Sequence, residues 1–224
     1  MRHQACHAQI TGGITHMEMQ NHQNIETGKI PPQLNHGGHE MFDVHEVLAS
    51  AVHALDTYTM LSQQVKDPEL QDILQRQMQF MAEEYNTTLE CFKTGLDPSQ
   101  PTKSYKMKQG NDFVFGMKPG QPKKPIQSAA EVSDQIISLS MLNAVKGGAV
   151  MKTNAALEST NPVVRRVLAD SLPNCIEMAY EISLYQNKHG YYQVPQLPQQ
   201  DMQLMQNGFA PASLQPQTPG NVTH

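Results

Sequence analysis

Two helix-start signals, 94 residues apart, constrain the fold of this chain more than any other feature. Asp67-Pro68 and Asn161-Pro162 each combine a good N-cap residue with a proline at the first helical position. Proline suits this position because the backbone N–H that it lacks would have no partner within the helix. Each pair follows one stretch of helically spaced apolar residues and precedes another. Because a turn this short makes two helices lie antiparallel, the sequence predicts two helical hairpins.

Apolar residues recur every three or four positions in four segments, which predicts four long helices. Their expected ranges are about 39–65, 68–94, 128–160 and 162–189. Ser128, with Glu131 three residues later, has the spacing of a capping box and is expected to start the third helix. Pro173 lies inside the fourth helix and is expected to kink it, because proline removes one bond of the helical ladder.

Each hairpin is too small to bury its apolar stripe alone, so the two hairpins are expected to pack face to face. Residues 95–127 would then be a crossover that runs the length of a helix, roughly 38 Å for about 25 residues. The prediction is an all-α fold, a ferritin-like four-helix bundle made of two αα-hairpins joined by one long crossover. Whether the 94-residue offset reflects a duplication is left open.

The two ends of the chain lack a sustained apolar period. Residues 1–38 scatter His and Gln, and residues 191–224 contain eight Gln and five Pro. We expect a flexible His/Gln-rich arm and a Gln/Pro-rich disordered tail on a bundle of residues 39–190. Within the crossover, the apolar patch Phe113–Phe115 is expected to cover an open edge of the core; a docking site for another subunit is the alternative.

Composition and charge exclude several classes of function. No run of about 18 apolar residues exists, so no membrane span is expected, and the first thirteen residues lack the apolar stretch of a secretory signal. A net charge of −5 argues against binding to nucleic acid. Cys6, Cys91 and Cys175 are too far apart for a zinc site or a disulfide framework. We expect reduced thiols in a cell interior, with Cys91 and Cys175 in the core.

The chain does not have the ligand pattern of a ferritin-like metal centre, which needs Glu from two helices and Glu-x-x-His from the other two. Glu83 is followed three residues later by Asn86, and Glu177 is followed by Tyr180. The third helix offers no inward Glu. We therefore predict no metal and no cofactor, with Glu83 and Glu177 as partly solvated or hydrogen-bonded bundle residues.

The first helix also contains histidines that could form an alternative metal site. His39, Glu46 and His53 are spaced by seven and lie roughly 140° from the Leu48–Leu55 stripe, so they are expected to face solvent. A surface metal or a pH-responsive contact is the alternative. Adventitious metal binding was also considered for the irregularly spaced histidines of the arm: His3, His7, His16, His22 and His36.

Sequence motifs of catalysis are absent as well. The chain has no Gly-x-Ser-x-Gly elbow, no phosphate loop and no dinucleotide fingerprint. Gly147-Gly148 falls inside the third predicted helix and is interpreted as permitting close approach of another helix. No catalytic residue is assigned, and the protein is not expected to be an enzyme.

Two segments resemble a known family. Leu34–Glu46, with the sequence LNHGGHEMFDVHE, and Lys66–Leu70 resemble the start of the Coat F domain of spore-forming Firmicutes. Met78–Met81 and Tyr85-Asn86 fit the second helix of that domain, and the resemblance covers roughly residues 34–190. It implies a ferritin-like bundle that is made during sporulation and deposited in the spore coat. It brings no catalytic residues.

We therefore predict a structural spore coat protein, synthesised in the cytoplasm of the mother cell and assembled into the protective coat. The expected partners are other spore coat proteins, with self-association left open, and neither nucleic acid nor a membrane. One alternative is a ferritin-like metal-binding or oxidant-handling protein with a degenerate di-metal site, and another is an adaptor that recruits coat proteins. Crosslinks through Tyr191, Tyr192 or Gln–Lys pairs are a further hypothesis.

Overall fold

The computed structural model describes residues 26–108, 110 and 112–212. Its four long helices are α1 (Gly38–Ser62), α2 (Pro68–Thr94), α3 (Asp134–Glu158) and α4 (Pro162–Lys188). Three 3-10 helices, η1 (Thr27–Lys29), η2 (Pro32–Leu34) and η3 (Ala129–Glu131), and the short α5 (Gln199–Gln206) complete the secondary structure. No β-strand occurs in this part of the chain, so the prediction of an all-α fold is confirmed.

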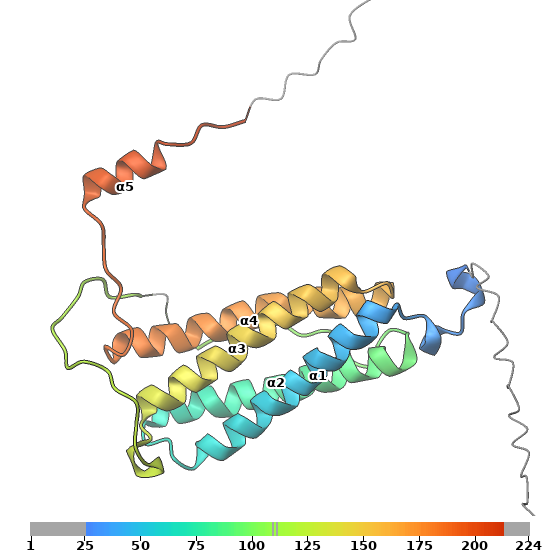
Figure 1. Ribbon diagram of the computed structural model, residues 1–224, viewed down its shortest axis with the longest axis horizontal. Coiled ribbons are helices and arrows are strands. Elements are labelled where there is room, and N and C mark those ends of the chain that lie inside the picture. Colours follow the sequence, from blue (N-terminus) through green and yellow to red (C-terminus); the bar gives the residue numbers. More distant parts are fainter. Residues whose placement is uncertain (1–25, 109, 111, 213–224) are drawn as a thin grey trace, which may run out of the picture.

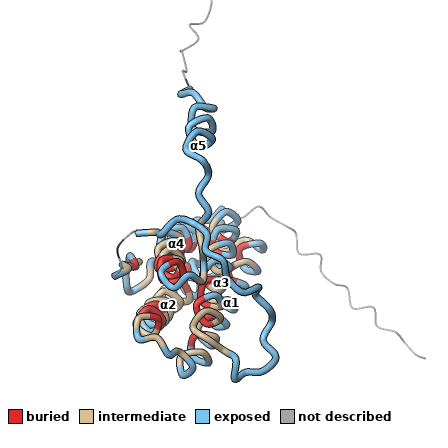
Figure 2. Tube along the Cα trace, turned by 90° about the vertical axis from the view of Figure 1, so that its left-hand side faces the viewer, coloured by how far each residue is buried: buried red, intermediate tan, exposed pale blue. Residues whose placement is uncertain are grey.

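The four long helices lie side by side (Figure 1). α1 packs against α2 and α3, and α4 packs against α3 and α2. Figure 2, a view along the helices, shows buried residues in the four-helix body, whereas the separate α5 is exposed. The segment between α2 and α3 is the long connection that carries the chain from one hairpin to the other.

The core consists of two clusters of buried apolar residues, one towards each end of the helices. The larger includes Tyr58, Leu74 and Ile182, and the smaller includes Val44 and Val164. All five of these residues are completely buried. Since burying one large apolar side chain contributes roughly 1.5–3 kcal/mol, these clusters are the main stabilising element of the fold.

The starts of α2 and α4 follow the predicted cap chemistry. Asp67 Oδ1 accepts a hydrogen bond from Glu69 N at 2.8 Å, and Asn161 Oδ1 accepts from Val163 N at 2.9 Å. α2 has the predicted bounds and α4 ends one residue early. α1 ends at Ser62, three residues before the expected end.

The predicted start of the third helix was wrong. Ser128 and Glu131 do interact, with Ser128 Oγ 3.3 Å from Glu131 Oε1, but they enclose the 3-10 helix η3. The extended backbone of Val132 (φ −60°, ψ 128°) then interrupts the helix. α3 begins at Asp134, after Ser133 as N-cap.

The crossover contacts α4 through the ring of Phe113 and the backbone of Val114. The Phe113 ring lies 5.5 Å from the ring of Tyr180. The Asn187 side chain accepts from Val114 N at 2.7 Å and donates to Val114 O at 3.0 Å. The side chains of Val114 and Phe115 are exposed, so Phe113 alone of the three covers α4.

The ends contain more local structure than the sequence predicts. Residues 26–38 of the predicted arm include η1 and η2, and the predicted tail contains α5, which stands apart from the four helices (Figure 1). Residues 1–25 and 213–224 lie outside the described residues, together with Cys6, His3, His7, His16 and His22.

Candidate functional site

Three inward-facing glutamates are the centres of the polar clusters inside the four helices. Glu40 lies in the first turn of α1, Glu84 in α2 and Glu181 in α4. The side chains of Glu40 and Glu181 are completely buried, and that of Glu84 is 12% exposed. A buried carboxylate is costly unless donors or cations compensate it, so the partners of each glutamate decide its role.

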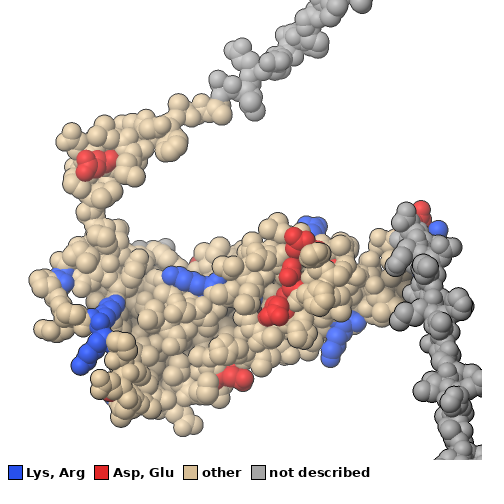
Figure 3. Space-filling view, in the orientation of Figure 1, with Lys and Arg blue, Asp and Glu red and all other residues tan. Residues whose placement is uncertain are grey.

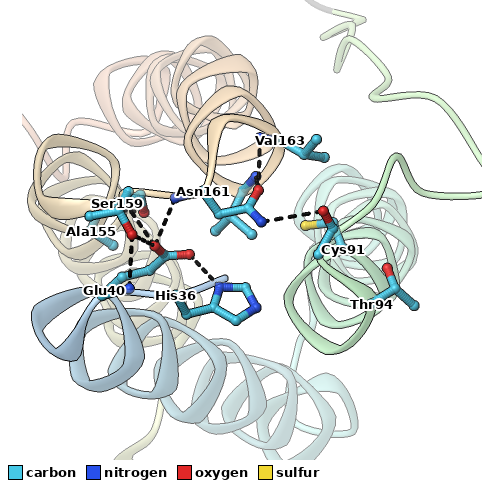
Figure 4. Close-up of polar contacts among 12 residues, drawn as sticks. His36, Glu40, Cys91, Thr94, Ala155, Ser159, Asn161 and Val163 are labelled. Atoms are coloured by element: carbon cyan, nitrogen blue, oxygen red, sulfur yellow. Dashed lines mark hydrogen bonds and ion pairs between the residues drawn. The ribbon is translucent and has the colours of Figure 1, made fainter. Parts of the chain in front are cut away.

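Glu40 connects α1 to the turn between α3 and α4. Its Oε2 accepts from Thr160 N and Thr160 Oγ1, both at 2.8 Å, and from Asn161 N at 2.9 Å. Its Oε1 lies 2.6 Å from His36 Nδ1 (Figure 4). Burial alone would raise the pKa of Glu40, but the hydrogen bonds from His36, Asn161 and Thr160 lower that pKa below its ordinary value.

Two further residues of the HGGHE segment, His36 and Gly37, lie close to the turn between α3 and α4. The His36 side chain is only 4% exposed and its ring lies 5.2 Å from that of Phe92. Gly37 N donates to Thr160 Oγ1 at 2.8 Å, and a Cβ at Gly37 would lie 2.9 Å from Thr160 Cγ2. The structure thus packs His36 against Phe92 of α2 and Gly37 against Thr160 of the second hairpin, although the sequence prediction assigned both residues to the flexible arm.

A matching contact occurs at the opposite end of the four helices. Asp134, at the start of α3, accepts a hydrogen bond from Lys66 N at 2.9 Å in the turn between α1 and α2. Asp134 lies 94 residues after Glu40, and Thr160 lies 94 residues after Lys66. In each hairpin, an acidic residue in the first turn of the first helix thus accepts hydrogen bonds from the loop that joins the two helices of the other hairpin. The 94-residue repeat therefore extends to tertiary contacts.

Glu181 fixes the crossover to α2 and α4. It accepts from Arg76 Nη2 at 2.7 Å, from Tyr105 OH at 2.5 Å and from Gln77 Nε2 at 3.1 Å. Gln77 Oε1 accepts in turn from Tyr58 OH at 2.9 Å, which adds α1 to the cluster. Burial and the hydrogen bond to Glu181 raise the pKa of Tyr105, so the phenol stays a proton donor.

Glu84 is neutralised by a lysine from α3. Lys152 Nζ pairs with Glu84 Oε2, and Asn174 Nδ2 donates to Glu84 Oε1 at 3.0 Å. Lys152 Nζ also lies 3.5 Å from Cys175 Sγ. Burial raises the pKa of the Cys175 thiol despite this lysine, so the thiol is not activated as a nucleophile.

Glu83 and Glu177, which were expected from the sequence to be partly solvated or hydrogen-bonded, lie outside these three clusters. Glu83 pairs at the surface with Lys103, at 2.8 Å, and Glu177 is half-buried without a place in the three clusters. His39, Glu46 and His53 are exposed on α1, as expected. In the described part of the chain, no group of three or more His, Cys, Asp or Glu side chains could hold a metal ion.

A groove of about 240 Å³ lies between α2, α4 and crossover residues 99–103. Its carboxylates have partners within the chain: Glu90 accepts from Ser99 N at 2.9 Å and from Ser99 Oγ at 2.8 Å, and Glu83 pairs with Lys103. A smaller cavity of about 40 Å³ lies beside Lys152 and Cys175. The polar groups at both places hold helices and crossover together.

These features define a class: an all-helical protein of two interlocked hairpins whose interior carboxylates bind the chain's own donors. The chain belongs to the Coat F domain family. The Coat F domain model matches residues 133–195. The chain is also 57% identical over 187 residues to the spore coat protein F-like protein YhcQ of Bacillus subtilis (strain 168), covering 83% of this chain and 86% of that protein.

The family membership confirms the resemblance seen in the sequence, although the family model falls on α3 and α4 rather than on the HGGHE segment. No solved structure matches the chain. Within the described residues, no helix has both the length and the apolar character needed to cross a membrane.

Proposed function

We propose that this protein is a structural component of the bacterial spore coat, without catalytic activity. The observation that carries the proposal is the 57% identity, across 83% of the chain, to a protein named as a spore coat protein. The interior chemistry supports it, because Glu40, Glu84 and Glu181 each bind donors of the chain itself. The three clusters connect helices, turn and crossover, which suits a stable building block.

We infer further that the fold is ferritin-like and that residues 39–190 are the folded unit, with residues 1–38 and 191–224 as extensions. The long crossover between two antiparallel hairpins supports this assignment. In this ferritin-like fold, the inward carboxylates of Glu84 and Glu181 are paired with the protein's own cations, Lys152 and Arg76.

The partners in this proposal are other spore coat proteins. One face of the molecule supports it: in Figure 3 the face shown is largely uncharged, with Lys, Arg, Asp and Glu scattered over it. Such a surface suits packing against neighbouring proteins more than binding to a polyanion.

The proposal is tested by following a fluorescent fusion of the protein in sporulating Bacillus subtilis, with unfused fluorescent protein as control. We expect the fusion to be made in the mother cell, to collect around the developing spore and to remain in the coat fraction after washing. The unfused protein should stay diffuse. A fusion that is folded but diffuse throughout sporulation would contradict a role in the coat.

A further inference from the structure

The helix α5 contacts none of the other helices. Figures 1 and 2 show it held away from the four-helix body, and no pairing with another element exists in the described residues. Its side chains Leu204 and Met205 are 66% and 64% exposed, and Phe209 just beyond it is 89% exposed. Because an isolated helix of this length is marginal in water, α5 needs a surface that covers its apolar residues.

The connection to α5 directs the helix away from its own molecule. The chain is fixed to the end of α4 as far as Val194, whose carbonyl accepts from Gly116 N at 2.8 Å, while Asn187 Nδ2 donates to Tyr192 O at 3.0 Å. Pro195 and Pro198 then restrict the short link before α5, and Pro198 has an extended backbone (φ −53°, ψ 142°). The helix is therefore presented to another molecule.

The outer face of α3 offers an apolar surface with a single positive charge. Leu139, Val150 and Leu157 are exposed along it. Lys146 is exposed, whereas the other lysine of α3, Lys152, is buried. No acidic residue occurs between the first and last residues of the helix.

Gly147, in the middle of this helix, is exposed, whereas its neighbour Gly148 is half-buried and lines the small cavity beside Lys152 and Cys175. A Cβ at Gly147 or at Gly148 would meet no atom within 4 Å, so the predicted close approach of a helix of the same molecule does not occur. Glycine inside a helix costs about 1 kcal/mol relative to alanine. The open space at Gly147, next to Lys146, instead allows a helix from another molecule to come close.

The charges of the two surfaces are complementary. Asp201 is the only charged side chain of α5 and of all described residues from 191 to 212. No ion pair or hydrogen bond joins the side chains of Asp201 or Lys146 to another described residue. A docking surface for α5 must accommodate this one carboxylate, and the outer face of α3 supplies one lysine without a competing acid.

We propose that α5 of one molecule docks on the outer face of α3 of a second copy, with Asp201 beside Lys146 and the apolar residues of the two surfaces in contact. The contact joins two different surfaces, so it propagates from copy to copy unless the geometry closes a ring. This contact adds to the proposed function a means by which coat subunits join. Its biological role rests on that proposed function.

The test measures self-association of the purified full-length chain by sedimentation velocity over a range of concentrations at low salt. The Asp201→Lys and Lys146→Glu variants should each weaken association at least about tenfold, which corresponds to 1.4 kcal/mol. An equimolar mixture of these two variants should recover association, because each variant then meets opposite charges on the other: the native pair of Asp201 with Lys146 in one contact and the reversed pair in the next. Lys93→Glu, at an exposed lysine of α2, is the matched control and should associate like wild type.

Deletion of residues 196–224 should abolish association while leaving the thermal unfolding midpoint unchanged, because α5 contacts no other helix. The inference is overturned if the wild-type chain stays monomeric, as it would if α5 folded back onto its own molecule, or if the mixture does not recover association. A monomer in solution whose fusion still collects around the spore would refute this contact and leave the proposed function standing.

Discussion

Gly37 and its neighbour Gly38 differ in their surroundings, and this difference gives a matched pair of substitutions. A Cβ at Gly37 would lie 2.9 Å from Thr160 Cγ2, and Thr160 is held in place by Glu40. Gly37→Ala should lower the free energy of unfolding by about 1–2 kcal/mol because the site is overpacked. Gly38 has open space around it, so Gly38→Ala should be neutral or stabilising by up to about 1 kcal/mol.

Urea unfolding followed by circular dichroism measures both values. Equal effects of the two substitutions would show that the segment does not dock against Thr160.

The buried carboxylate of Glu40 should make stability depend on pH. Its folded-state pKa is lowered, so its contribution is present above the unfolded-state pKa and is lost as the pH falls through the folded-state pKa. Glu40→Gln should cost about 2 kcal/mol near pH 7, because four contacts to a buried charge are weakened. This cost should shrink as the pH is lowered below about 4.5.

Unfolding free energies of wild type and variant across pH 3–7 check this prediction. Glu46→Gln, an exposed position on the same helix, is the control and should leave the curve unchanged. A cost for Glu40→Gln that does not vary with pH would exclude a charged Glu40 in the folded protein.

The inward-facing glutamates are single residues that the sequence prediction missed. It considered Glu83 and Glu177, as partly solvated or hydrogen-bonded residues, whereas Glu84 and Glu181 face inward. The signal was present in α2, because Glu84 lies on the seven-residue spacing of Leu70, Gln77 and Cys91, all of which are buried. Neighbouring helical residues differ by about 100° in direction, so choosing between two adjacent glutamates requires the register of the whole face.

Among the elements, α2 and α4 were predicted closely because an N-cap followed by proline is a local signal. The start of α3 was not, since Ser128 and Glu131 satisfy the same cap chemistry in a 3-10 turn. The true start places Asp134 against Lys66 N. That contact joins residues far apart in the sequence, which a local pattern cannot report.

The crossover is held to α2 and α4 by several hydrogen bonds, and Tyr105 is its buried contact with Glu181. Tyr105→Phe removes the hydroxyl that donates to Glu181 and accepts from Arg76 at 2.7 Å. We expect a loss of about 1–3 kcal/mol in stability and faster tryptic cleavage at Lys103 and its neighbouring lysines. Limited proteolysis with mass spectrometry identifies the cut sites.

Tyr192→Phe, at an exposed tyrosine, serves as the control for this experiment and should leave the cleavage rate unchanged. Unaltered cleavage in Tyr105→Phe would mean that the other contacts of the crossover, such as the Lys103–Glu83 pair and the Val114–Asn187 hydrogen bonds, hold it without the Tyr105 hydroxyl.

For the whole molecule, the all-α class followed from helical periodicity alone, but the docking of residues 36–37, the path of the crossover and the isolation of α5 did not. The arm and the tail lack a repeating apolar pattern. Their contacts depend on single groups such as Gly37, which donates to Thr160, and Val194, which accepts from Gly116, and these partners are distant in the sequence.

The two buried cysteines report on opening of the whole core. Burial raises the pKa of Cys91 to about 11 and also raises that of Cys175, so few thiolates exist at neutral pH. In a Cys6→Ser variant, both thiols should react with a disulfide reagent at least roughly 100-fold more slowly than in the urea-unfolded chain. Absorbance of the released thiol measures the rate.

Core-destabilising variants should speed this reaction in proportion to their loss of stability if the thiols react only after global unfolding. Rapid labelling of either cysteine in the native protein would instead reveal a local opening around it.

The hydrogen bonds between the hairpins also determine when, during translation, the loop of each hairpin can form its tertiary contact. Lys66 N has its acceptor only when Asp134 has been added to the growing chain, 68 residues later. At ribosomal speeds of 5–20 residues per second, this delay is roughly 3 to 14 s. Glu40 waits longer still, for Thr160 and Asn161. A chain whose translation stops within the crossover therefore has neither turn completed, and only a chain that has entered α4 has both.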